Sequence, residues 1–187
     1  EERLFMVFSG FVEQELMKNR LYIDNRNEFR SFFLTDLLTN RYRDPKIIEK
    51  RLAAINITPA DHMHFVVIRV RDAEETDSSA SILATQLGKI LQHQLYAIKD
   101  NSLVILLNLE ENQTISDFLL AQIKQLSEFN NIVAGVSNPF TNVKFLTRFY
   151  QEAKQAVQVG QVHHPEKHVI FFNDVNDLIL LEACKES

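Results

Sequence analysis

The stretch that decides the fold is Tyr96-Ala97-Ile98-Lys99-Asp100-Asn101-Ser102-Leu103-Val104-Ile105-Leu106-Leu107. Two apolar runs, 95–98 and 103–107, flank the polar residues 99–102. Polar residues between two short runs of this kind are typical of a β-hairpin. The sequence therefore predicts two antiparallel strands joined by a turn near the centre of the chain.

The segments on both sides of this hairpin alternate between the period of a strand and that of a helix. Gly135 lies inside one predicted strand, which indicates close approach of a neighbouring backbone. Gly160 follows a helical pattern, where a glycine is typical of a helix end. In chain order we expect a strand at 64–70, a helix through 82–91, the hairpin, a helix through 115–129, a strand at 132–137, a helix from 146 that stops at Gly160, a strand at 168–172 and a helix at 177–183.

The element order from residue 62 onward is therefore β-α-β-β-α-β-α-β, which predicts an α+β sandwich of ferredoxin-like type. Helical patterns precede it at 1–20 and 29–38. Asp44-Pro45 is typical of an N-cap followed by proline in the first turn, so a third helix begins there and closes before Pro59. We expect a helical lead-in and dimerisation region at 1–60, the α+β domain at 61–176 and the start of a linker helix at 177–187.

Composition excludes several classes of protein. The 187 residues are 45% hydrophobic and 24% charged, with a net charge of -5, so a folded domain is expected without general affinity for nucleic acid. The single cysteine, Cys184, excludes a disulfide framework within the chain. No apolar run is long enough for a bilayer, and no signal-like segment follows Glu1-Glu2. We expect an internal piece of a longer cytoplasmic protein without a membrane partner.

The order of elements resembles that of nucleotide cyclases of the GGDEF type. Those enzymes carry a glycine-rich turn and acidic residues at the hairpin, and a metal-binding carboxylate at the end of the first strand. In this chain the turn is Lys99-Asp100-Asn101-Ser102, and the strand ends in Arg69-Val70-Arg71 with Asp72 beyond. A guanidinium cannot bind Mg²⁺. We therefore expect no catalytic residues, no cofactor, no metal and no cyclase activity.

The chain also resembles the GGDEF-like middle domain of the PucR/CdaR family of bacterial transcription regulators, over residues 30–181. The similarity lies in the order and spacing of segments at 32–38, 47–57, 134–137, 149–156 and 169–175. The resemblance implies a signal-transduction role, between an N-terminal sensing region and a helix-turn-helix domain that would begin after Ser187. DNA would then be bound only through that absent domain, and the module would form a homodimer.

Two alternatives stay open for the N-terminal aromatic residues. Phe5, Phe8, Phe11, Phe32 and Phe33 concentrate large rings outside the α/β unit. A helix that exposes them would favour self-association, whereas a helix docked on its own domain would bury them.

A second function follows from the cations near the predicted strand ends. Arg69, Arg71, Lys99 and Asn101 are candidates for an anion pocket that would sense a small-molecule or nucleotide effector. The plainer interpretation is that these residues keep strand edges soluble.

Other titratable clusters have an ordinary structural interpretation. For His62, His64, His163, His164 and His168 we favour solvated histidines over a metal site. The acidic residues of 72–77 are expected to form a solvated loop that caps the next helix.

Overall fold

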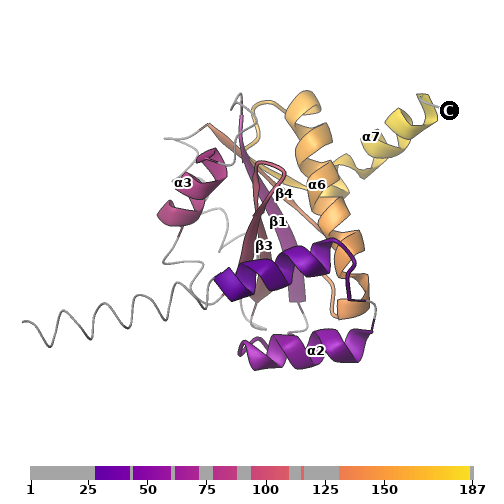
Figure 1. Cartoon of the computed structure of the whole chain (residues 1–187). Helices are drawn as coiled ribbons and strands as arrows, with labels where there is room; N and C mark the ends of the chain where they lie inside the picture. The colour runs from indigo at the N-terminus through magenta and orange to yellow at the C-terminus, as the bar shows by residue number, and fades with distance from the viewer. Residues whose placement is uncertain are drawn as a thin grey trace, which may run out of the picture.

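The computed structural model describes residues 28–42, 44–59, 62–71, 78–87, 94–109, 115 and 131–185. In this part of the chain a five-stranded sheet separates two layers of helices (Figure 1). The predicted α+β class is confirmed. The predicted helix at 1–20, the acidic loop at 72–77 and nearly all of the predicted helix at 115–129 lie outside the described residues.

The strands of the sheet lie in the order β2-β3-β1-β4-β5. Strand β1 is central and pairs antiparallel with β3 and with β4, while β4 and β5 run parallel. The bounds are β1 His62–Val70, β2 Leu95–Lys99, β3 Ser102–Leu109, β4 Ile132–Val136 and β5 Val169–Phe171.

The hairpin is confirmed, with a turn of only two residues. Lys99 pairs with Ser102, and both intervening residues have positive φ, 50° at Asp100 and 55° at Asn101. Two-residue turns with positive φ at both positions match the twist of the flanking strands, and Asn and Asp tolerate this conformation better than most residues. The polar tetrapeptide therefore predicts the position of the turn, while the structure shows that Lys99 and Ser102 still belong to the strands and that only two residues form the turn itself.

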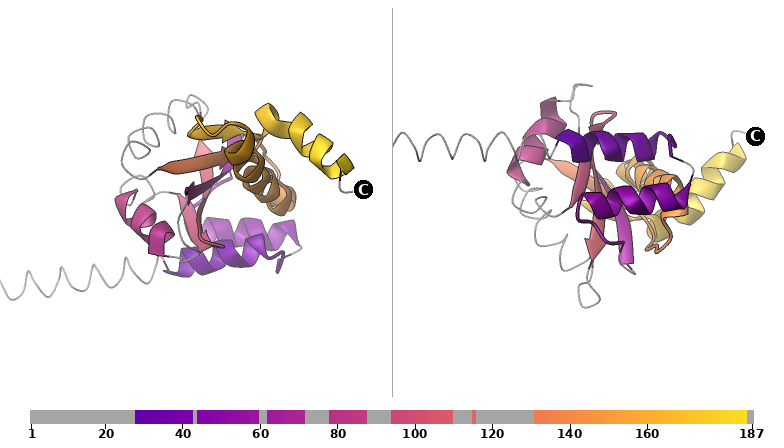
Figure 2. Two further views of the ribbon diagram at one scale, coloured as in Figure 1. Left: turned by 90° about the horizontal axis from the view of Figure 1, so that it is seen from above. Right: turned by 60° about the horizontal axis from the view of Figure 1, so that its bottom comes forward.

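Two helices precede the sheet and run side by side (Figure 2). Residues 28–38 form the first, and α2 spans Pro45–Ala54 with the side chain of Asp44 accepting from the backbone N–H of Lys46. The guanidinium of Arg30 donates to the carbonyl of Ile55 and so ties the first helix to the end of the second. The Asp44-Pro45 start signal is confirmed.

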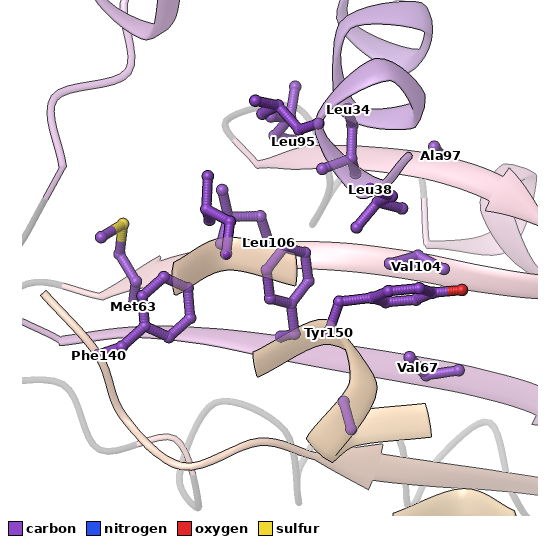
Figure 3. Packing of buried hydrophobic residues seen from close by; sticks show 14 of the residues in the cluster. Leu34, Leu38, Met63, Val67, Leu95, Ala97, Val104, Leu106, Phe140 and Tyr150 are labelled. Atoms are coloured by element: carbon purple, nitrogen blue, oxygen red, sulfur yellow. The ribbon is translucent and has the colours of Figure 1, made fainter. Parts of the chain in front are cut away.

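The sheet carries a separate core on each face. One face packs against helix 28–38, α2 and α6 (Leu146–His163), and Figure 3 shows part of that core around Tyr150. The other face packs against α3 (Ser78–Gln86). Every second residue of the strands points to this face, among them Val66, Ile68 and Ile105. This alternation decides which side chains of β1 and the hairpin face α6.

Gly135 permits close contact between β4 and α6, as expected. A Cβ at this position would lie 2.3 Å from the carbonyl oxygen of Ala153 and 2.7 Å from the backbone nitrogen of Val157. No side chain fits against backbone at those distances.

Gly160 does not end α6, so the expected helix end at that residue is wrong. The helix continues to His163, and Gly160 packs against Ile170 of β5, where a Cβ would lie 2.3 Å from Cδ1. His164, directly before Pro165, is the C-terminal cap of the helix, because helical geometry is disfavoured for a residue that precedes proline.

The last helix begins earlier than expected. Helix α7 spans Phe172–Lys185, whereas the sequence pattern predicts a start at Asp177. Strand β5 has only three residues because its last residue, Phe171, pairs with Val136, where β4 ends. Phe172 has no strand partner and begins the helix. Helix α7 extends away from the sheet (Figures 1 and 2).

Candidate functional site

The tip of the β2–β3 hairpin lies between the end of β1 and the middle of α6. On β1, Arg69 follows Phe65 and Val67 in alternation and shares their face of the sheet. On the hairpin, Lys99 and Ser102 pair directly across the turn. Tyr150 reaches over this face from α6, with its ring between Val67 and Val104 (Figure 3). Three elements therefore bring polar groups to one place.

Arg69 fastens the end of β1 to the hairpin turn. Its Nε donates to Oγ of Ser102 at 3.2 Å, and its Nη2 donates to the carbonyl oxygen of Asp100 at 3.3 Å. Oγ of Ser102 in turn donates to the same carbonyl at 3.2 Å. The guanidinium thus occupies the space beside the turn and holds it by hydrogen bonds.

The carboxylate of Asp100 lies between two lysines. Nζ of Lys154, on α6, is 3.3 Å from Oδ2, and Nζ of Lys99 is 3.8 Å from Oδ1. Arg69 binds the backbone carbonyl of the same residue, so three cations contact Asp100. These four described residues therefore carry an excess of positive charge, although the chain as a whole is acidic. We call these four residues, with Ser102 and Tyr150, the hairpin-tip cluster.

Tyr150 is affected electrostatically by this cluster. Burial raises the pKa of its hydroxyl to about 12, with the charge of Asp100 adding to the rise and that of Arg69 opposing it. The phenol therefore stays protonated at neutral pH, so it is suited to donating a hydrogen bond rather than to taking up a proton.

The structure brings together only some of the anion candidates. Arg69 and Lys99 lie at the hairpin tip, and Asn101 forms half of the turn. Arg71 does not join them, because its Nη2 donates to the carbonyl of Lys167 and its backbone N–H to that of Asn131. Arg71 thus fastens β1 to the segment before β5, on the far side from the hairpin.

Four members of the cluster were not among the anion candidates: Asp100 and Ser102, which the sequence predicts only as turn residues, and Tyr150 and Lys154. The last two stand four residues apart on α6, a spacing that places both on one helical face. Both also lie in the segment 149–156 on which the family resemblance rests, but nothing in that segment links them to the hairpin. Lys154 lies 54 positions after Asp100 in the chain. The two residues are close in space because α6 packs on the sheet.

The histidines are not all solvated, and for His64 that expectation is wrong. His64 is buried on β1, and its Nδ1 lies 3.1 Å from the carbonyl oxygen of Ser137. Burial lowers the pKa of its imidazole, while the bond to Ser137 opposes the shift. His168 is exposed, and its Nδ1 lies 3.1 Å from the carbonyl oxygen of Ile132. Among the described residues, no three His, Cys, Asp or Glu side chains are grouped so as to hold a metal ion.

The chemistry of this tip does not suit a magnesium–nucleotide complex. Magnesium requires oxygen ligands, whereas Arg69, Lys99 and Lys154 supply only donors and positive charge. The carboxylate of Asp100 is already contacted by both lysines. The cluster is chemically fit to bind an anion or to hold the hairpin against α6.

The strand order defines an α+β domain in which the β2–β3 hairpin forms one edge of the sheet and β1 is the central strand, so a hairpin at the centre of the sheet is not what the structure shows. The family model described as the GGDEF-like domain matches residues 39–159, and the chain belongs to that family. A search of the curated proteins finds no match to the chain. Within the described ranges, each helix is too short or too polar to cross a bilayer.

Proposed function

We propose that the chain is a non-catalytic regulatory module of a PucR-type bacterial transcription regulator, which relays the state of a sensor to a downstream helix-turn-helix domain. The observation that carries the proposal is the hydrogen-bonded position of Arg69 beside the hairpin turn. A GGDEF-like scaffold with a guanidinium in place of a metal-binding carboxylate retains the fold and loses the cation ligands.

The contacts of α6 support a relay. This helix contacts β1 and β4, meets the hairpin tip through Lys154 and packs against α7. Helix α7 extends away from the sheet, toward the position where a following domain would be attached (Figure 1). A change at the hairpin tip that moves α6 would therefore also shift α7, which packs against it. Such a relay requires two packings with different affinities for an upstream signal.

The partners in this proposal are a second copy of the chain and, through the domain beyond Ser187, an operator DNA. The acidic net charge of the chain agrees with DNA binding by another part of the protein. The compartment would be the bacterial cytoplasm, where such regulators meet DNA.

Two measurements test the proposal. Incubation with GTP and Mg²⁺ is expected to yield no cyclic dinucleotide, and appearance of that product would overturn the non-catalytic assignment. Sedimentation velocity across a concentration series is expected to show a dimer. A chain that stays monomeric at high micromolar concentration would contradict the dimeric module.

A second candidate function is anion sensing, which the hairpin-tip cluster favours. Two lysines contact the carboxylate of Asp100 there and Arg69 contacts its backbone carbonyl, so an anionic effector would find charge complementarity. Calorimetry with GTP, cyclic di-GMP and purine or sugar-acid metabolites tests this function. Heat of binding that Arg69→Ala removes, and that Arg71→Ala leaves unchanged, would support it. The absence of heat with every ligand would exclude these effectors.

A further inference from the structure

The carboxylate of Asp100 is held loosely within the hairpin-tip cluster. Its side chain is 50% exposed, and its oxygens lie 3.3 Å from Nζ of Lys154 and 3.8 Å from Nζ of Lys99. The first distance is long for a hydrogen bond between charged groups, and the second is too long for any hydrogen bond. Ion pairs that solvent reaches contribute little to stability. Asp100 can therefore leave the two lysines at low cost.

The cations of the cluster do not depend on this carboxylate for their positions. Arg69 donates to Oγ of Ser102 and to the backbone carbonyl of Asp100, and neither acceptor belongs to the carboxylate. Lys99 is the last residue of β2, and Lys154 lies in the middle of α6. The packing of β1, β2 and α6 therefore keeps the three cations near one another when the carboxylate turns away.

The charge of the cluster favours a ligand with two negative charges. Arg69, Lys99 and Lys154 carry three positive charges and Asp100 carries one negative charge, so two positive charges remain on these four residues. A phosphate monoester carries close to two negative charges at neutral pH and has three acceptor oxygens. Ammonium and guanidinium groups each have several N–H donors for such oxygens. A phosphate group therefore matches these cations better than a single carboxylate does.

We propose that the carboxylate of Asp100 is an internal occupant of an anion site, and that the phosphate group of a small ligand displaces it from Lys99 and Lys154. The inference rests on the anion-sensing function proposed above, for which it names the ligand class and the group that the ligand replaces. Displacement breaks the ion pair between the hairpin tip and α6, and α6 packs against α7. Binding would in this way reach the helix that leads out of the domain.

The test measures the affinity of the whole chain for inorganic phosphate, glycerol phosphate and acetate by calorimetry at constant ionic strength. The pH is held at about 8, above the second pKa of a phosphate ester, which is about 6. We expect both phosphate ligands to bind more tightly than acetate. Tighter binding of glycerol phosphate would identify an ester as the source of the group, and tighter binding of inorganic phosphate would identify the free ion. Either result supports the site.

The decisive variant is Asp100→Asn. It removes the internal negative charge and keeps the turn, because asparagine tolerates the positive φ of 50° at this position as aspartate does. We expect this variant to bind phosphate about threefold more tightly than the wild-type chain, the size of effect that an exposed ion pair has. Phosphate that binds the variant and not the wild-type chain would support the proposal as well.

A second pair of variants tests where phosphate binds, after circular dichroism has established that both fold. Lys154→Met removes one cation of the site. Lys144→Met is the matched control, because Lys144 is exposed in η1 (Val143–Phe145), ten positions before Lys154. Lys154→Met is expected to weaken phosphate binding about tenfold, as loss of a hydrogen bond to a charged group does, and Lys144→Met to leave it unchanged.

The outcomes separate this inference from the function on which it rests. Phosphate binding that Asp100→Asn weakens or leaves unchanged would overturn the role of Asp100 and leave anion sensing standing. Equal losses in the two lysine variants, or acetate that binds as tightly as phosphate, would overturn the phosphate site. If neither the wild-type chain nor Asp100→Asn binds either phosphate ligand, the inference fails, whereas anion sensing fails only if the effectors named above also give no heat.

Discussion

Arg69 and Ser102 stand 33 positions apart in the chain, and Nε of the arginine donates to Oγ of the serine at 3.2 Å. This bond joins the end of β1 to the first residue of β3, beside the turn that connects β3 to β2. Because Arg69 also binds the carbonyl of Asp100, one side chain holds the whole hairpin tip against the central strand.

The first prediction concerns the energy of that link. In a double-mutant cycle of Arg69→Met and Ser102→Ala, the coupling free energy is expected to be about 1 kcal/mol, the usual contribution of a single hydrogen bond. Urea denaturation of the four proteins measures it. A coupling free energy near zero would contradict the role of Arg69 in holding the turn.

The second prediction compares the two packed glycines. Gly135→Ala is expected to lower the free energy of unfolding by at least about 3 kcal/mol, because the new methyl group would meet the backbone of α6 at 2.3 Å and 2.7 Å. Gly160→Ala is expected to lower the free energy of unfolding by less. Its new methyl group meets the side chain of Ile170, which can shift, and alanine is more favourable than glycine within a helix by about 1 kcal/mol.

Urea denaturation measures both variants. As a control, adding Ile170→Val to Gly160→Ala removes the Cδ1 methyl and is expected to recover part of the stability. Equal losses for the two glycine variants would show that their contacts differ less than the structure indicates.

The third prediction concerns stability at acidic pH. Because burial lowers the pKa of His64 in the folded state below the ordinary value of 6.5, the unfolded chain takes up a proton at a higher pH than the folded chain. The contribution of His64 to the free energy of unfolding is therefore complete above pH 6.5, and it is lost as the pH falls from there toward the lowered pKa. Thermal unfolding between pH 7 and the acid limit of the fold measures this loss.

His64→Asn keeps a donor for the carbonyl of Ser137 and cannot titrate, so it is expected to flatten that pH dependence. His163→Asn is the control, because His163 is exposed at the end of α6. If wild type and His64→Asn lose stability in parallel on acidification, His64 is not the responsible group.

The fourth prediction concerns alkaline pH. The pKa of Tyr150 is raised to about 12 in the folded state, so the unfolded chain loses this proton first, near pH 10. The resulting contribution to stability is complete below pH 10 and is lost as the pH rises toward 12. In a titration followed by phenolate absorbance, Tyr150→Phe should remove a transition near pH 12. Loss of a transition near pH 10 instead would contradict the burial of this hydroxyl.

Local chemistry made several features predictable from the sequence. The Asp44-Pro45 start of α2 depends on a side chain and the backbone two residues later, and the Asp100-Asn101 turn depends on the conformations that these residues tolerate. Gly135 is a further case, since a glycine inside a strand indicates close packing. The sequence Arg69-Val70-Arg71 also predicts that no metal ion is bound at the end of β1, and that stays a prediction.

The candidate site was only partly predictable, because long-range packing selects its members. Arg71 has the same charge as Arg69 and lies two residues away, yet it binds the carbonyl of Lys167, 96 positions later. Lys154 joins the cluster from α6 because that helix lies across the sheet. The roles of the module in dimerisation and transcription regulation stay predictions.

The sequence alone determined the α+β class, the hairpin and its turn, because each depends on periodicity and on the preferences of adjacent residues. Only the tertiary structure decided that Gly160 lies within a helix, that α7 begins at Phe172 and that Lys154 meets Asp100. Those features depend on which surfaces pack together, and contacts between distant segments can override the local preference of any single residue.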